Sequence, residues 1–256
     1  MVWPCFRSQG WGGSGAWRRR KEGLGGAVPR RGPCCSQEAA MDAAINQAGD
    51  SEAAAQLSDA ELVARVIDPR RRSRDSEARA RLCLESCGGL GPALALADPR
   101  LERQIGAEAC LQLRLVREAS IRTTRGAVIS RRFDANAKRT HDYLRALLEF
   151  ETRESFRVIF LDASGAWSSD EELGRGTVDH APVYVREVMR EALRRDAAAL
   201  VLVHNHPSGD PTPSAADVQV TSEIAAAASA LGMSVKDHLV VGSHGVASFQ
   251  ALGLLS

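Results

Sequence analysis

The stretch of sequence that decides the fold is 197–217, which reads AAALVLVHNHPSGDPTPSAAD. It opens with a short continuous apolar run, 197–203, which is typical of a buried central strand. A loop with three prolines follows, and an alanine-rich helix is expected from Ser214 to Leu231, ended by Gly232. Strand, loop and helix in this order predict part of a sheet covered by helices.

The flanking sequence extends this unit in both directions. Residues 156–161 predict a strand whose two faces are both largely covered, and residues 166–178 predict a return strand and loop. An amphipathic helix is expected over 183–195. Two last strands are expected at 238–241 and 246–248, so that residues 130–256 form an α/β or α+β domain.

A separate, all-helical module is predicted over residues 57–125. Ser58 with Glu61 three residues later is a capping-box pattern, and the helix that begins there ends before Pro69. The other helices are expected at 76–87 (stopped by Gly88-Gly89), 92–96, 99–104 and 107–121. A polar connector over 125–138 and a helix near 140–149 then lead into the α/β domain.

Charge is distributed unevenly along the chain of 256 residues. The formal net charge is +1, but residues 1–40 carry +5, residues 41–130 carry zero and residues 131–256 carry −4. Residues 1–56 show no helical or strand periodicity and are expected to be an unstructured extension. Two interpretations remain open: a basic arm that contacts nucleic acid or lipid, or a natural start at Met41, which we favour.

Cysteine usage and hydropathy bear on the compartment. Beyond the extension there are three cysteines, Cys83, Cys87 and Cys110, and there is no CxxC unit. Cys83 and Cys87, one helical turn apart, are expected to be small buried hydrophobes. No apolar run has the length of a signal-peptide core or a membrane span. The sequence therefore predicts a cytoplasmic protein without a membrane partner.

Three side chains of the 197–217 stretch have the spacing of a metal site. His204 and His206 are two residues apart at the end of a strand, so both imidazoles point to the same face. Asp217 in the first turn of the next helix adds a carboxylate oxygen, and a fourth position stays open, as in catalytic zinc sites. An alternative remains open, because Ser214 and Asp217 also make a capping box by themselves. Ordinary structural roles are expected for His141, His180 and His238.

This stretch resembles the JAMM (MPN+) metalloprotease motif, and its flanking words, HNHPSGDPTPS and DHLVVG, resemble the RadC family. The resemblance implies a mixed MPN/JAMM-like sheet flanked by helices over 130–256. It also implies Zn²⁺ bound by His204, His206 and Asp217, with Glu154 as general base for the zinc-activated water. Glu149 and Glu151 are rivals for that role. Ser214 would stabilise the oxyanion, a task that competes with helix capping for the same hydroxyl.

The helical module resembles a degenerate helix-hairpin-helix unit. Gln104 stands where the family pattern has the first glycine, and only Gly106 remains. With no net charge on the module, DNA binding is weakly supported. The sequence thus predicts a zinc-dependent hydrolase that acts on a peptide or isopeptide bond of an unidentified peptide or protein substrate. The alternatives are a DNA-repair-associated nucleic-acid-binding protein with a non-catalytic MPN scaffold, and a domain that binds a protein tail without cleaving it.

Overall fold

The computed structural model of the chain describes residues 54–69, 74–96, 98–176 and 183–255. Most of the expected extension at 1–56, the arginines at 70–72 and His180 lie outside the described residues. Among the described helices, none combines the length and apolar character that a membrane crossing requires.

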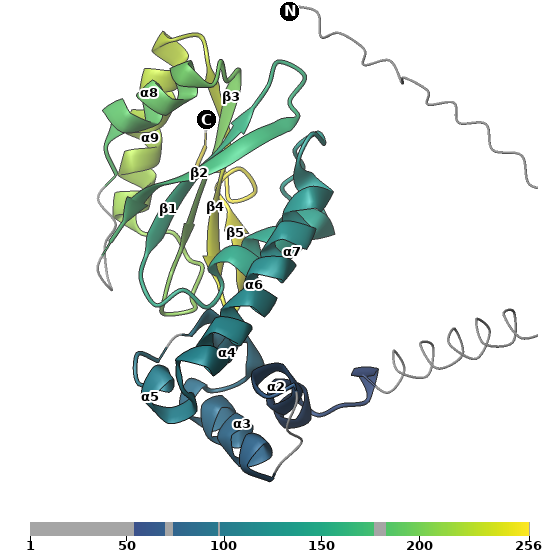
Figure 1. Ribbon diagram of the computed structural model, residues 1–256. Helices are drawn as coiled ribbons and strands as arrows, with labels where there is room; N and C mark the ends of the chain where they lie inside the picture. The colour runs from purple at the N-terminus through teal and green to yellow at the C-terminus, as the bar shows by residue number, and fades with distance from the viewer. Residues whose placement is uncertain (1–53, 70–73, 97, 177–182, 256) are drawn as a thin grey trace, which may run out of the picture. The chain divides into compact units, whose positions relative to one another are not determined.

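A mixed five-stranded sheet forms the centre of the C-terminal half (Figure 1). Its strands are β1 (Ser155–Leu161), β2 (Trp167–Arg175), β3 (Ala199–Asn205), β4 (Ser234–Gly242) and β5 (Gly245–Ser248). They lie in the order β2-β1-β3-β4-β5, and only β3 and β4 are parallel, because helix α9 connects them. The mixed sheet implied by the family resemblance is confirmed, and all seven residues of β3 are buried at its centre.

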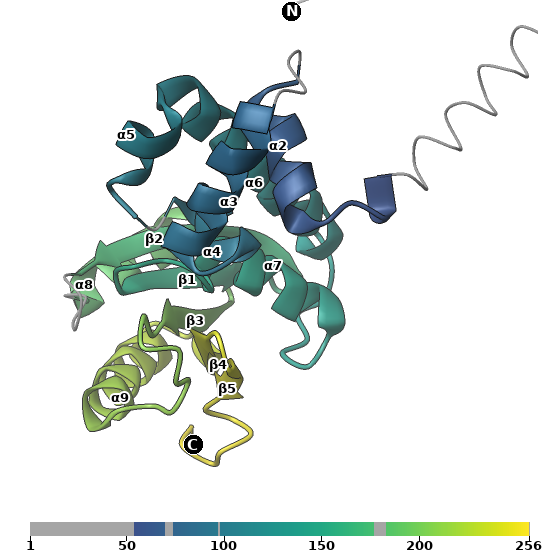
Figure 2. The same cartoon turned by 90° about the horizontal axis from the view of Figure 1, so that it is seen from below.

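Helices cover both faces of this sheet, as Figures 1 and 2 show. On one face, α8 (Val185–Arg194) and α9 (Ala215–Ala230) pack over a core that includes Phe156, Leu202 and Ile224. On the other face, α7 (Lys138–Leu148) packs with Tyr143 and Leu144 over the alternate residues of β1 and β3. The strand alternation therefore supplies apolar side chains to both sides, as the sequence predicts.

A second core lies among the helices that precede the sheet. They are α2 (Asp59–Ile67), α3 (Arg74–Cys87), α4 (Leu90–Ala95), α5 (Leu101–Ile105) and α6 (Ala107–Val128). The capping box of Ser58 and Glu61 is present at the start of α2. Cys83 is buried in this core as expected, whereas Cys87 is only partly buried at its edge; Cys110 is buried as well, among residues such as Leu113.

The predicted end of the long helix at Ile121 is wrong, because α6 continues to Val128. The sequence predicts a polar connector from residue 125, but the helix includes residues 122–128. In the structure they are helical, and their polar side chains point to solvent or to a partner, since Arg125 pairs with Asp170 at 3.3 Å. A polar run on the solvent-facing side of a helix is hard to distinguish from a loop without knowledge of the packing.

The backbone of the loop that follows β3 lies directly against the end of β4. A Cβ atom added to Gly242 would lie 2.2 Å from the backbone oxygen of Gly209, so the substitution Gly242→Ala forces the loop to move. We expect it to lower the free energy of unfolding by about 2–3 kcal/mol in urea denaturation. The matched control is Gly126→Ala within α6, where nothing lies near the added atom; it is expected to stabilise by about 1 kcal/mol. An unchanged denaturation midpoint for Gly242→Ala would contradict this close packing.

Candidate metal centre

Three potential ligand atoms converge at the carboxyl end of β3. The Nε2 atoms of His204 and His206 are 2.9 Å apart. Asp217 Oδ1 lies 3.4 Å from His204 Nε2, and Asp217 Oδ2 lies 3.6 Å from His206 Nε2. The period of the strand and the first turn of α9 thus bring together the three residues that the sequence analysis selected as ligands.

Two of the three distances match those around a small tetrahedral cation. Zinc bound to nitrogen and oxygen at about 2.0–2.2 Å has neighbouring ligand atoms about 3.3–3.6 Å apart. The two distances that involve Asp217 fall in that range, and the distance between the imidazoles is shorter. Two imidazoles with one carboxylate are also a donor set that zinc accepts, with one position left open.

The site is buried at the bottom and open at one side. The side chain of His204 is 1% exposed, whereas those of Asp217 and His206 are 14% and 19% exposed. The Asp217 carboxylate raises the pKa of His206 because it stabilises the protonated imidazole, against the opposing effect of burial. Burial alone would raise the pKa of Asp217, but the adjacent imidazoles of His204 and His206, together with the hydrogen bond from Ser214, outweigh it and hold that pKa well below its usual range. Asp217 is therefore an anion that faces the open side.

The capping box of α9 fixes the orientation of Asp217. The backbone N–H and the hydroxyl of Ser214 both donate to Asp217 Oδ2, at 2.7 and 2.6 Å, and the Asp217 N–H donates back to the hydroxyl. The capping box and the ligand cluster, which the sequence left as alternatives, are therefore both formed by the same carboxylate. Oδ1 has no such partner within the capping box and faces His204.

Glu154 lies next to this cluster because of the sheet register. Phe156 pairs with His204 across the antiparallel strands β1 and β3, so two residues further along Glu154 comes opposite His206. Its carboxylate is one of the charges that raise the pKa of His206. Its rivals have other partners: Glu149 pairs with Arg145, and Glu151 pairs with Arg117 and Arg175.

Asn205, the residue between the two histidines, holds the backbone on both sides of Glu154. Its Oδ1 accepts from the Ser155 N–H at 2.8 Å, and its Nδ2 donates to the Arg153 carbonyl at 3.1 Å and weakly to that of Glu151 at 3.5 Å. Asn205 itself is 1% exposed. Sequence reasoning missed this role, although the alternation that points the histidines one way points Asn205 to the other side, toward β1.

The substitution Asn205→Ala is expected to lower the free energy of unfolding by about 3 kcal/mol, because it leaves the buried Ser155 N–H without its acceptor. The matched control is Asn136→Ala, an exposed position, with an expected change below about 0.5 kcal/mol. Urea denaturation of the metal-free protein measures both. Equal denaturation midpoints for the two variants would show that the hydrogen bonds of Asn205 (the Asn205 clamp) contribute nothing to stability.

His238, for which an ordinary structural role was expected, also makes a contact with a candidate ligand that sequence reasoning did not predict. It is fully buried in β4, and its Nε2 lies 2.8 Å from His204 Nδ1. Its Nδ1 lies 2.6 Å from the hydroxyl of Thr221 in α9. Burial holds the pKa of His238 well below its ordinary value. His141, by contrast, has the structural role expected, with its Nε2 2.8 Å from the carbonyl of Ala135.

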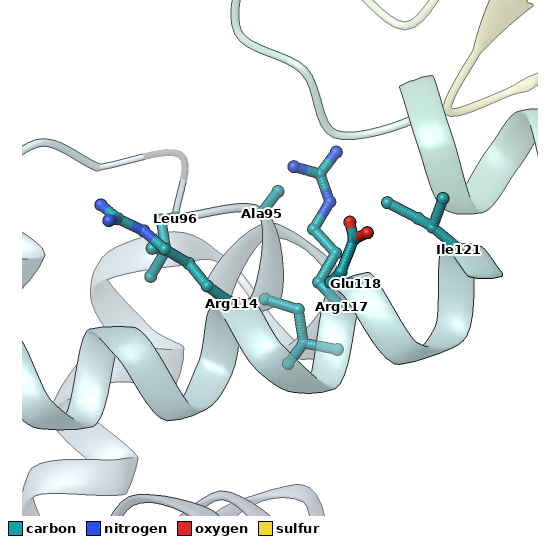
Figure 3. Close-up of a pocket in the computed structure, with 7 residues that line it drawn as sticks. Ala95, Leu96, Arg114, Arg117, Glu118 and Ile121 are labelled. Atoms are coloured by element: carbon teal, nitrogen blue, oxygen red, sulfur yellow. The ribbon is translucent and has the colours of Figure 1, made fainter.

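A hollow of about 410 Å³ lies elsewhere, between the end of α4 and the middle of α6 (Figure 3). Arg117 and Arg114 lie on its wall with Leu96. Arg117 is already engaged, because it donates to Glu151 at 2.7 Å and to the carbonyl of Leu147 at 3.0 Å. None of the five predicted site residues lines this hollow, which separates it from the metal centre.

Comparison with known proteins agrees with this fold. The family model of the RadC-like JAB domain matches residues 135–254. A UPF0758 protein of Rhodobacter capsulatus is 43% identical over 201 residues, which are 78% of this chain and 94% of the relative. A UPF0758 protein of Ruegeria pomeroyi is 39% identical over 204 residues, 79% and 91% of the two chains.

The mixed sheet, with a histidine pair at the end of its central strand and a candidate metal-binding group beside it, is that of a JAB/MPN-type α/β domain. The similarity covers nearly the whole length of both relatives. The chain belongs to the RadC family.

Proposed function

We propose that the chain is a zinc-dependent hydrolase that cleaves a peptide or isopeptide bond. The observation that carries this proposal is the convergence of His204, His206 and Asp217 at 2.9–3.6 Å, beside a glutamate that has no ion pair in the described part of the chain. A zinc ion held there would supply a Lewis acid that polarises a carbonyl group and acidifies a water molecule.

Glu154 is proposed as the general base. Because it lies opposite His206 at the open side of the cluster, its carboxylate can accept a proton from the attacking water and return it to the leaving amine. The Asn205 clamp fixes the backbone on both sides of this carboxylate, which limits its movement between the two proton transfers.

Ser214 is proposed to stabilise the oxyanion. Its hydroxyl donates a hydrogen bond to Asp217 Oδ2, so this task requires the hydroxyl to turn toward the substrate. The Ser214 backbone N–H continues to hold Oδ2 during that turn, so the orientation of Asp217 is preserved.

Amide hydrolysis fits the surroundings of the cluster better than phosphodiester hydrolysis. The stretch 197–235, which contains all three candidate ligands, has no lysine or arginine. Phosphoryl transfer depends on cationic side chains that neutralise charge on the phosphate oxygens.

The test uses the full-length chain in three measurements. Metal analysis is expected to find about one zinc per chain, and a proteome-derived peptide library incubated with the protein is expected to show new termini by mass spectrometry, which a chelator abolishes. A gel shift with duplex DNA at rising salt is expected to show little binding. Cleavage that survives complete zinc removal refutes the hydrolase proposal, and tight salt-sensitive DNA binding without cleavage favours the nucleic-acid alternative.

A further inference from the structure

We propose that Thr221 and His238 are positioning residues that set the tautomer of His204, so that its Nε2 lone pair faces the metal centre. The inference rests on the metal site of the proposed function and extends it to residues of α9 and β4. It is supported by a series of three hydrogen bonds, from the Asp217 carbonyl through Thr221 and His238 to His204, whose direction of donation is fixed at the carbonyl.

The fixed end is the backbone carbonyl of Asp217. Thr221 Oγ1 lies 2.5 Å from this oxygen. Because a carbonyl oxygen only accepts, the Thr221 hydroxyl donates its proton to this hydrogen bond. Thr221 therefore has only lone pairs to offer to its second partner, His238 Nδ1, at 2.6 Å. It follows that His238 carries a proton on Nδ1 and donates it to Thr221.

The protonation of His238 in turn determines which nitrogen of His204, a candidate metal ligand, carries the proton. A second proton on His238 Nε2 would place a charge on a side chain with no exposed surface, which is strongly unfavourable. His238 Nε2 therefore accepts, and its partner at 2.8 Å, His204 Nδ1, donates. A neutral imidazole with its proton on Nδ1 has its lone pair on Nε2, the atom that lies in the ligand cluster.

His206 reaches the same tautomer by a different route. Its Nδ1 lies 2.7 Å from the backbone carbonyl of Asp210, which again only accepts. The two Nε2 lone pairs then face each other across 2.9 Å, next to the carboxylate of Asp217. Lone pairs and an anion so close together repel one another unless a proton or a metal ion lies between them. The hydrogen bonds behind the ligands thus prepare the site for a cation.

The first test needs no substitution. Long-range ¹H–¹⁵N NMR spectra of the metal-free wild-type protein report the tautomer of each histidine, and we expect the Nδ1–H form for His204, His206 and His238. The Nε2–H form of His204, or a doubly protonated His238, would overturn the proposal. Either result leaves zinc binding and peptide cleavage by the wild-type protein untouched, so this failure is distinguishable from failure of the proposed function.

The second test removes the Thr221 hydroxyl, which links the Asp217 carbonyl to His238. Thr221→Val is expected to lower zinc affinity by about 10–100-fold in competition with a chelator, and to mix the tautomers of His204. Thr221→Ser keeps the hydroxyl and is expected to retain the wild-type tautomer and an affinity within about 3-fold.

The matched control is Thr123→Val, because exposed Thr123 makes the same hydrogen bond to the carbonyl four residues before it, 2.8 Å away, with no histidine attached. It is expected to leave zinc affinity unchanged. Equal affinities and unchanged His204 tautomers in Thr221→Val and Thr123→Val would refute the positioning role.

Discussion

Replacing Glu154 by glutamine is expected to lower the rate of peptide cleavage by about 10²–10⁴-fold while zinc content stays at about one per chain. The amide keeps the size and the hydrogen-bonding capacity of the carboxyl group but cannot accept a proton from water. Because Glu154 is none of the three ligands, and because Asn205 holds the backbone around it, the metal centre keeps its geometry. The rate is measured as the appearance of new peptide termini, and the metal content by elemental analysis.

The matched control for this variant is Glu149→Gln. Glu149, the residue directly after α7, was a rival for the same role, but it pairs with Arg145 of α7 at 2.8 Å. Its replacement is expected to leave cleavage within about twofold and to affect stability by less than about 0.5 kcal/mol. Full activity of Glu154→Gln would exclude it as the base, and loss of activity in the control alone would transfer the role to Glu149.

Replacing His206 by alanine is expected to lower zinc affinity by more than about 10²-fold, so that the protein as purified holds far less than one zinc per chain. Loss of a supporting residue behind a ligand typically costs 10–100-fold in affinity, and loss of a ligand atom itself costs more. The side chain is partly exposed at the open side of the site, so the fold tolerates its removal. Chelator competition measures the affinity, and circular dichroism checks the fold.

His141→Ala is the control for His206→Ala. It removes an imidazole that contacts a backbone carbonyl at the start of α7, away from the cluster, and zinc affinity is expected to stay at the wild-type value. Stoichiometric zinc in His206→Ala would reject the assignment of the site. The expected order of zinc affinities is therefore wild type and His141→Ala, then Thr221→Val, then His206→Ala.

The parts of the site that local sequence predicts are those that local geometry controls. The two-residue period of β3 places His204 and His206 on one side, and the first turn of α9 brings Asp217 to them across a short loop. The same applies to the buried strand, predicted at 197–203 and found at 199–205, and to the capped starts of α2 and α9, which depend on contacts between residues close in sequence.

The parts that sequence reasoning missed depend on pairing between distant segments. His238 meets His204 because β4 pairs in parallel with β3, with His238 opposite Leu202, and no pattern within either strand reports that register. The contacts of Asn205 with residues 151–155 depend in the same way on the pairing of β1 with β3. The extent of α6 was missed because its last two turns are polar and find their apolar partners only through Val128.

The length of α6 has a consequence for how the protein unfolds. Its first half contributes Ala109, Cys110 and Leu113 to the core among the helices, while Ile121 and Val128 near its other end pack with the residues beneath the sheet. One continuous helix, α6, therefore contributes side chains to both hydrophobic cores. Neither core can unfold without exposing apolar surface in the other. The helices α2–α6 therefore stabilise the domain that contains the candidate metal centre, and we expect the two to unfold together.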